Sequence, residues 1–231
     1  MKNILLIGGS YGIGLAIAKE LQFENNVFIA SRSNENLADV KATYIPFDAS
    51  TDVLDTSKLP SVIDGLVYCP GSINLRPFKG IKPEAFETDL QINFISLVKV
   101  IQSVLPNLLA AEQASIVTFS SVAASMGMPF HTSVSASKGA IEGFSKALAA
   151  EYAPKIRVNV IAPSLTDTPL ADKFLNNETK QEKSAERHPL KRFGKPEDSA
   201  QMATFLLSDK SSWISGQIFH VDGGMSTLLV N

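Results

Sequence analysis

A glycine-rich turn near the amino terminus constrains the fold of this chain more than any other feature. A short apolar run, residues 3–7, is followed by the sequence GGSYGIG at residues 8–14, and residues 13–21 then have helical periodicity. Gly8 suits the positive φ of a tight turn, Gly12 has no Cβ to keep a phosphate at a distance, and Gly14 lets the helix pack close to the strand. Free N–H groups and the dipole at such a helix start attract a pyrophosphate. The turn therefore predicts a dinucleotide site formed by Gly8, Ser10, Tyr11, Gly12, Ile13 and Gly14.

Short apolar runs alternate with helical segments along the rest of the chain. The expected strands are residues 3–7, 27–30, 43–45, 66–69, 115–119, 157–161 and 217–221. The expected helices are residues 13–21, 83–109 with a break, 133–152 and 196–207. Short, continuously apolar strands separated by helices are typical of a parallel sheet covered on both faces. Residues 1–231 contain no linker or repeat, so the pattern predicts a single α/β domain with a doubly wound parallel sheet and a ligand at the carboxyl ends of its strands.

Composition narrows the classes of function. The 231 residues include 21 Lys and Arg against 23 Asp and Glu, a net charge of -2 that disfavours a nucleic-acid-binding protein. The single cysteine, Cys69, cannot form an internal disulfide, which suits the reducing cytoplasm. The apolar start is too short for a signal peptide, and no continuous apolar run approaches the ~18 residues of a membrane helix. The histidines and the cysteine lack the spacing of a metal site, so we expect no metal. The charge balance and the short apolar runs likewise lead us to expect neither nucleic acid nor a membrane as partner.

The end of the second expected strand indicates which dinucleotide binds. An acid at this position accepts a hydrogen bond from the ribose 2′-hydroxyl of NAD, whereas an arginine accommodates the 2′-phosphate of NADP. Here the strand ends with Ser31, Arg32 and Ser33, and no acid is present. The Arg32 guanidinium can form two hydrogen bonds to a phosphate, and the two serines can donate beside it. The sequence therefore favours NADP over NAD, the other interpretation being that Arg32 is an ordinary surface residue.

Residues 166–195 differ in character from the rest of the chain. They are rich in Lys, Glu and Asn, and apolar residues are sparse among them. Such a segment forms either a solvated pair of surface helices or a mobile lid over a substrate cleft, since binding loops are drawn from poorly packed segments. We refer to residues 166–195 as the lid segment.

Taken together, these motifs resemble the short-chain dehydrogenase/reductase family, in its main form of about 250 residues. The similarity extends over nearly the whole chain. It includes the glycine turn, Gly71 after the fourth strand, Asn93 in a helix, Ser120 and Ser121 after the fifth strand, and the C-terminal runs at residues 192–197 and 216–224. The resemblance implies a Rossmann fold in which Asp48 and Ala49 contact the adenine and Gly71 and Thr168 contact the rest of the cofactor.

The same resemblance implies a catalytic set that is incomplete in this chain. In the family, a serine orients the carbonyl, a tyrosine thirteen residues later donates the proton, and a lysine four residues further on lowers the pKa of that tyrosine. Ser121 and Lys138 match the serine and the lysine, but the tyrosine position holds Val134, which has no proton to donate. By resemblance, Lys138 also binds the nicotinamide ribose, and Asn93 holds a water connected to it. We therefore expect Asn93, Ser121 and Lys138 to be catalytic.

Loss of the tyrosine leaves several sources for the proton. His131 lies seven residues before Lys138, a spacing that the tyrosine has in the enoyl reductase branch of the family, and its ordinary pKa near ~6.5 suits donation. A lone histidine in a loop is nevertheless usually a packing residue. Ser133 and Ser135 are poor acids. Tyr152 lies at the far end of the helix expected at residues 133–152, too far from Val134 to donate. A water held by Ser121 and Lys138 and a proton of the substrate itself are the two further sources.

Three functions are compatible with these residues. The first is an NADP(H)-dependent oxidoreductase acting on a small carbonyl, alcohol or activated alkene with a proton donor other than tyrosine. The second is a catalytically silent relative that binds NADP(H) as a sensor or structural subunit, and the third is non-redox chemistry on the same fold. The resemblance also implies a homodimer or homotetramer, which the apolar tail at residues 228–230 fits. The absent tyrosine favours the second function, and the retained Ser121 and Lys138 favour the first.

Overall fold

A seven-stranded sheet runs through the centre of the molecule, whose computed structural model describes residues 1–230. The strands are β1 (Lys2–Ile7), β2 (Asn25–Ser31), β3 (Thr43–Pro46), β4 (Gly65–Tyr68), β5 (Ala114–Phe119), β6 (Ile156–Pro163) and β7 (Ile218–Val221). Their spatial order is β3-β2-β1-β4-β5-β6-β7, and every neighbouring pair is parallel. This confirms the doubly wound parallel sheet, and each strand end lies within two residues of the sequence prediction.

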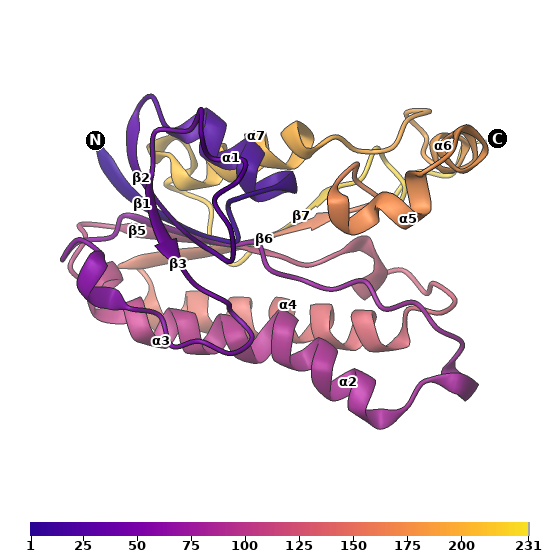
Figure 1. Ribbon diagram of the computed structural model, residues 1–231, viewed down its shortest axis with the longest axis horizontal. Coiled ribbons are helices and arrows are strands. Elements are labelled where there is room, and N and C mark those ends of the chain that lie inside the picture. The colour runs from indigo at the N-terminus through magenta and orange to yellow at the C-terminus, as the bar shows by residue number, and fades with distance from the viewer. Residues whose placement is uncertain (231) are drawn as a thin grey trace.

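Helices cover both faces of this sheet (Figure 1). They are α1 (Gly12–Leu21), α2 (Pro83–Leu90), α3 (Ser96–Leu109), α4 (Thr132–Tyr152), α5 (Asp172–Leu175), α6 (Glu178–Glu186) and α7 (Pro196–Leu207). Helices α1 and α7 pack against each other on one face, whereas α2, α3 and α4 lie on the other (Figure 1). The short helices α5 and α6 lie together at one end of the molecule, and both belong to the lid segment.

The two faces of the sheet have separate hydrophobic cores, and β1 contributes to both. Leu5 and Ile7 pack into the core under α3 and α4, while Ile4 and Leu6 pack into the core under α1 and α7. Successive side chains of a strand point to opposite faces, so a strand buried on both faces reads as a continuous apolar run. This is why residues 3–7 of the sequence are uninterrupted by a polar side chain after Asn3.

The helical run from residue 83 to 109 is continuous, although the sequence predicts a break in it. A π-helical segment, Gln91–Ile95, joins α2 to α3 and places Asn93 in the interior, where it is 0% exposed. A π-helical turn inserts one extra residue without ending the helix. By length and hydropathy, Pro83–Leu109 is apolar enough to span a membrane, which corrects the expectation based on uninterrupted apolar runs. Its buried side chains, among them Leu97 and Leu108, pack in the core of the sheet.

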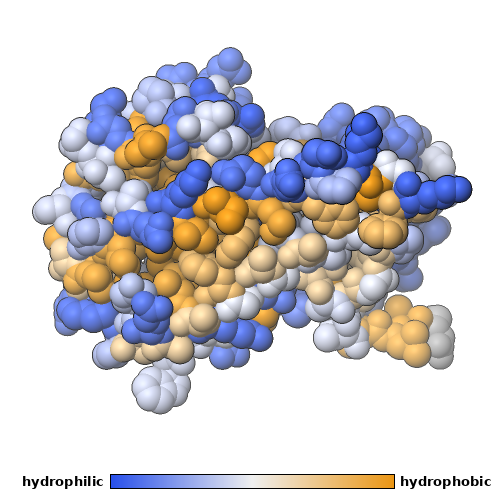
Figure 2. All heavy atoms as spheres, turned by 90° about the horizontal axis from the view of Figure 1, so that it is seen from below, coloured by the Kyte–Doolittle hydropathy of each residue, from blue (hydrophilic) through white to orange (hydrophobic). Residues whose placement is uncertain are grey.

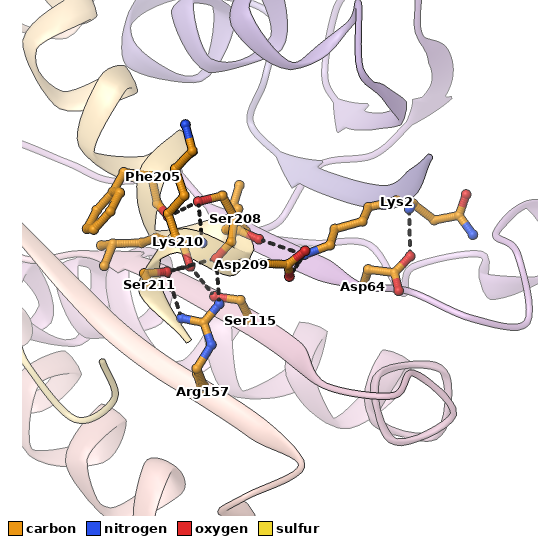
Figure 3. A network of polar contacts seen from close by, with 12 residues as sticks. Lys2, Asp64, Ser115, Arg157, Phe205, Ser208, Asp209, Lys210 and Ser211 are labelled. Atoms are coloured by element: carbon orange, nitrogen blue, oxygen red, sulfur yellow. Dashed lines mark hydrogen bonds and ion pairs between the residues drawn. The ribbon is translucent and has the colours of Figure 1, made fainter. Parts of the chain in front are cut away.

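At the amino ends of the strands, polar contacts connect the sheet to the end of α7 and the turn that follows it (Figure 3). The Arg157 guanidinium, at the start of β6, donates to the Ser211 hydroxyl at 3.0 Å and to the Ser208 carbonyl at 3.3 Å. Ser115 of β5 donates to the carbonyl of Leu206 at 2.8 Å. These bonds tie the sheet to the end of α7 and the turn after it. At the carboxyl ends, the strand order reverses between β1 and β4, and open α/β sheets bind ligands at such a point.

Candidate active site

A cavity of about 460 Å³ lies over the carboxyl ends of β1 and β2, beside the start of α1. Its wall includes every residue that the sequence predicts for the dinucleotide except Lys138: Gly8, Ser10, Tyr11, Gly12, Ile13, Gly14, Ser31, Arg32, Asp48, Ala49, Gly71 and Thr168. These residues come from five separate loops. They converge because the carboxyl ends of parallel strands meet at one edge of a sheet.

The glycine turn has the geometry that an anion site requires. Gly8 and Gly12 have φ values of +80° and +57°, a region that side-chain-bearing residues rarely adopt. A Cβ on Gly14 would lie 2.3 Å from the carbonyl oxygen of Gly8, so only glycine permits this packing of α1. No side chain caps the start of α1 and no acid lies in its first turn, so its N–H groups are left for a ligand. The turn therefore fits a pyrophosphate.

Arg32 and Tyr11 form the outer edge of this cavity. The Arg32 guanidinium donates to the Tyr11 hydroxyl at 2.5 Å. That bond, together with the nearby Asp48 carboxylate, raises the pKa of Arg32 above its ordinary value. A permanent cation therefore lies at the end of β2, where the sequence predicts a contact to a 2′-phosphate.

Ser31 lines the same cavity beside Arg32. It is 4% exposed, and its hydroxyl donates to the carbonyl of Ser33 at 2.9 Å. Short polar side chains readily bond to the backbone two residues away. That Ser31 donates to a phosphate beside Arg32 stays a prediction.

A second cavity of about 150 Å³ continues from the first. The two share a boundary formed by Ile13, Cys69, Gly71, Thr168 and Leu170. Ser121, Val134 and Lys138 lie together on the wall of the second cavity. The structure therefore brings Ser121, Val134 and Lys138 together, and it places them next to the first cavity.

Ser121 and Lys138 each have a proton available for chemistry. The Ser121 oxygen accepts a hydrogen bond from the N–H of Ala123 at 3.2 Å, which leaves its O–H free to donate into the cavity. Lys138 is 7% exposed and its ammonium donates to the carbonyl of Phe119 at 2.9 Å. Burial lowers the pKa of Lys138 to about 8, with the nearby groups Cys69 and Asp89 opposing that shift. Lys138 is thus an acid whose strength suits neutral pH.

His131 lies farther from this centre. Its Nδ1 is 2.7 Å from the carbonyl of Pro129, and because a carbonyl only accepts, Nδ1 carries the hydrogen. His131 lines a third cavity and is absent from the wall that Ser121 and Lys138 share.

Comparisons with known proteins agree with this geometry. A family model described as enoyl-(acyl carrier protein) reductase matches residues 8–226. The chain is 33% identical over 241 residues to the 3-oxoacyl-(acyl-carrier-protein) reductase FabG of Thermotoga maritima, with 97% of each chain covered. It is 30% identical to 2-(S)-hydroxypropyl-CoM dehydrogenase 3 of Xanthobacter autotrophicus, covering 99% of this chain and 98% of the relative.

Solved structures give the same result. A short chain dehydrogenase family protein from Francisella tularensis subsp. tularensis SCHU S4 superimposes with a TM-score of 0.89 at 30% identity, covering 99% of this chain and 100% of the other. The chain belongs to the short-chain dehydrogenase/reductase family. The ligand-free aldohexose dehydrogenase of Thermoplasma acidophilum, at 27% identity and a TM-score of 0.90, covers 100% of this chain and 96% of that one. Enzymes of this family are oxidoreductases that use nicotinamide cofactors.

Asn93 of this short-chain dehydrogenase/reductase lies behind the active site. A Cβ on Gly71 would lie 3.2 Å from Asn93 Oδ1 and 3.3 Å from Lys138 Nζ, so both groups lie close to Gly71 and leave little room for a side chain there. The Asn93 amide donates to the Ser72 hydroxyl at 2.9 Å and to the Asp89 carbonyl at 2.8 Å. Asn93 thus holds the loop after β4 in place, and it lines none of the three cavities described.

Sequence reasoning missed Asp89, a carboxylate in the same network. It is 2% exposed and accepts hydrogen bonds from Ser72 at 2.5 Å and from Ser133 of α4. Asp89 precedes Asn93 by one helical turn, a spacing that puts both on one face. That spacing is the only signal in the sequence, because the serines that bind Asp89 come from other elements.

A third cavity, of about 370 Å³, extends the second cavity toward the lid segment. The second and third cavities share Ile73, Ser121, Val134, Ser164 and Leu165. The three cavities therefore adjoin one another in a trench, and Ser121 and Val134 lie where the second cavity meets the third. Helices α5 and α6 border the third cavity, so the lid segment covers the far end of this trench.

Proposed function

We propose that this protein is an NADP(H)-dependent oxidoreductase that interconverts a small carbonyl compound and its alcohol, or reduces an activated alkene. One observation carries the proposal: Ser121 and Lys138 share the wall of a small cavity that opens directly into the dinucleotide cavity. A carbonyl held in the small cavity would therefore face the end of a cofactor lying along the larger one. The inner cavity, at about 150 Å³, fits the reacting part of a small substrate.

The cofactor roles follow the walls of the larger cavity. We assign the pyrophosphate to the glycine turn, with Gly8, Ser10, Tyr11, Gly12, Ile13 and Gly14. Arg32, with Ser31 beneath it, binds the 2′-phosphate, and Asp48 and Ala49 border the adenine. Gly71, Thr168 and Lys138 lie at the nicotinamide end, where the two cavities meet. The permanent charge of Arg32 supports NADP over NAD.

Val134 occupies the position of the family tyrosine in this assignment, so another group supplies the proton. A nicotinamide held by Gly71, Thr168 and Lys138 would supply a hydride to the carbonyl carbon. Ser121 donates a hydrogen bond to the carbonyl oxygen, which accumulates negative charge as the hydride arrives. Lys138 then gives a proton to that oxygen through a water, so that one carbonyl, one hydride and one proton form the alcohol. The pKa of Lys138, about 8, supports this role.

Cofactor binding tests the first half of the proposal. We expect NADPH to raise the Tm more than NADH at equal concentration, because only a ligand of the folded state stabilises it. Equal shifts would remove the assignment of NADP, and no shift with either would remove the function altogether.

Replacing Val134 tests the second half. We expect Val134→Tyr to raise carbonyl reduction by about 10²-fold or more, the usual contribution of a positioned acid. Val134→Phe is the matched control, since it adds the ring without the hydroxyl. A folded Val134→Tyr protein that binds NADPH but reduces no carbonyl better than Val134→Phe would favour a catalytically silent NADP(H)-binding protein instead.

The assembly and setting of the enzyme belong to the same proposal. Figure 2 shows apolar side chains gathered over the face that α2, α3 and α4 form, where Ile95 and Leu109 are more than one-third exposed. An apolar face of this kind supports a homodimer or homotetramer through the long helices. The free, half-buried thiol of Cys69 supports a reducing, cytoplasmic setting. Light scattering on the purified protein tests the assembly, and a monomeric mass at micromolar concentration would contradict it.

A further inference from the structure

The third cavity is lined by two kinds of side chain. The apolar ones are Ile73, Leu75, Val122, Met128, Met225 and, from α5, Phe174. Polar and basic side chains of α5 and α6, in the lid segment, line it as well. Ser121 and Val134 line both this cavity and the second one. A substrate that reaches Ser121 through the third cavity therefore passes both kinds of side chain.

All charged side chains that line this cavity are cations. They are Lys173 of α5, Lys180 and Lys183 of α6, and Arg187 at the end of α6, and no carboxylate lines the cavity. The chain as a whole has more acids than bases, 23 against 21, so the general composition does not explain this selection. A cleft lined by charges of one sign concentrates ligands of the other.

Helix α6 separates its charges by face. Lys180, Lys183 and Arg187 are spaced by three and four residues, so they lie on one face, and that face borders the cavity. Glu178, Glu182 and Glu186 are spaced by four residues and lie on another face; none of them lines the cavity. A merely solvated helix has no reason to sort its charges in this way.

The four cations are not neutralised by the protein. Lys173 donates to the carbonyl of Ile73 at 3.1 Å, and Lys180 donates to the carbonyl of Lys173 at 2.7 Å and to Asn176 at 2.8 Å. These partners are uncharged, so the ammonium charges persist. Within residues 1–230 the three ion pairs involve other residues, and Lys183 and Arg187 have no hydrogen-bond partner for their side chains.

We propose that the substrate is a small organic anion whose charged group binds Lys183 and Arg187, while its apolar segment lies along Val122 and Met128. This inference rests on the proposed function and names the substrate class for it. The reacting carbonyl or alcohol then lies beside Ser121, at the inner end of the same molecule. A carboxylate, a sulfonate and a phosphate share the chemistry required, because each accepts hydrogen bonds from ammonium and guanidinium groups.

Calorimetry with unreactive probes tests the proposal without relying on turnover. The probes are hexanoate, hexanesulfonate and hexyl phosphate, with neutral hexan-1-ol as the reference, each titrated in the presence and absence of NADPH. We expect at least one anion to bind about tenfold more tightly than hexan-1-ol, and its affinity to fall as salt is added. The strongest of the three anions identifies the charged group. Hexan-1-ol binding as tightly as every anion overturns the proposal.

Matched double variants locate the effect. We expect Lys183→Gln with Arg187→Gln to remove the tenfold preference while the Kd for NADPH stays unchanged. Glu182→Gln with Glu186→Gln, on the other face of α6, changes the same number of charges and leaves the preference intact. If the preference survives in the first variant, or disappears equally in both, the lid cations do not bind the anion. Failure of NADPH to bind removes the proposed function, whereas the titrations without NADPH still test the anion site.

Kinetics supply the second readout. We expect a 3-oxo acid to be reduced with a KM at least about tenfold lower than that of its neutral methyl ester, and this ratio to approach one in the Lys183→Gln, Arg187→Gln protein. Reduction only of a thioester carried on an acidic carrier protein, with no binding of free anions, would overturn the proposal.

Discussion

The two ends of the sheet use polar groups in opposite ways. At the amino ends, Arg157 is 5% exposed, and its guanidinium donates hydrogen bonds to the Ser211 hydroxyl and to backbone carbonyls (Figure 3). At the carboxyl ends, the glycine turn, Arg32 and Ser121 keep donors directed into open cavities. The first arrangement stabilises the fold, and the second leaves binding capacity that only a ligand can use. We therefore expect substitutions at the two ends to separate stability from function.

Gly14 is an exception to this separation, because we expect its substitution to lower both stability and cofactor binding. Its added Cβ would meet the Gly8 carbonyl oxygen at 2.3 Å, so we expect Gly14→Ala to lower the free energy of unfolding by about 3 kcal/mol and to abolish NADPH binding. Urea unfolding and calorimetry measure the two effects. Gly80→Ala is the control, because a Cβ there meets nothing within 4 Å. Ordinary stability in the Gly14→Ala protein would show that α1 can move away from the turn.

Arg157 tests the amino end. We expect Arg157→Leu to lower the free energy of unfolding by about 2–3 kcal/mol, because the Ser208 and Ile214 carbonyls lose a buried donor. The Kd for NADPH should stay within about twofold, since the cofactor cavity lies at the other end of the sheet. Lys2→Ala removes the ion pair to the exposed Asp209 and a long hydrogen bond to the Leu207 carbonyl, and it should cost less than about 1 kcal/mol. A parallel loss of NADPH affinity in Arg157→Leu would couple the two ends.

Substitution of Lys138 should lower turnover without lowering stability, the opposite of what we expect for Arg157. We expect Lys138→Met to lower turnover by about 10²-fold and to leave the free energy of unfolding at pH 7 equal or higher, because a buried ammonium is costly. A large loss of stability would mean that the bond from Lys138 to the Phe119 carbonyl outweighs the cost of burial.

The lowered pKa of Lys138 also predicts how stability and turnover change with pH. The pKa of Lys138 is lowered from 10.5 to about 8 on folding, so between these values the unfolded chain binds more protons than the folded one. The free energy of unfolding of the natural protein should therefore rise with pH across this window, relative to Lys138→Met. Turnover in the direction of reduction should fall in the same window, as the ammonium is lost. Denaturation at pH 7 and pH 9.5 checks the first statement, and a pH–rate profile checks the second.

Arg32 should give the smallest of these effects. We expect Arg32→Ala to raise the Kd for NADPH about tenfold and to leave the Kd for NADH unchanged, because only NADPH carries the 2′-phosphate. NADH serves as the control within the same protein. Equal weakening of both cofactors would mean that Arg32 acts through Tyr11 on the glycine turn and does not distinguish the two.

The sequence predicts the fold well where local signals and packing agree. Residues 196–207 form α7 as predicted, since Pro196 and two acids mark its start. The break expected within residues 83–109 is instead a π-helical segment at Gln91–Ile95, because whether a helix breaks or takes in an extra residue depends on what its side chains contact. Here Asn93 meets Ser72, which is distant in sequence.

The site is predictable to the extent that it lies on loops after strands. The glycine turn, Arg32 and Ser121 lie at strand ends, where topology alone brings them together. Asp89 lies inside a helix and binds serines of two other elements, so no pattern near it reveals its role. The basic face of α6 is visible as a spacing of lysines, but the sequence does not say that this face borders a cavity.

The π-helical segment Gln91–Ile95 also constrains how many residues the helical run from Pro83 to Leu109 can contain. Each residue advances an α-helix by about 100° and 1.5 Å, so deleting one residue from this turn would rotate all of α2 by about that angle relative to α3. Asp89 would swing off the face that meets Ser133, and the pairing of α2 with α4 would lose its one buried carboxylate. The number of residues between Pro83 and Leu109 is therefore fixed by geometry, whereas many of the side chains along it are free to vary.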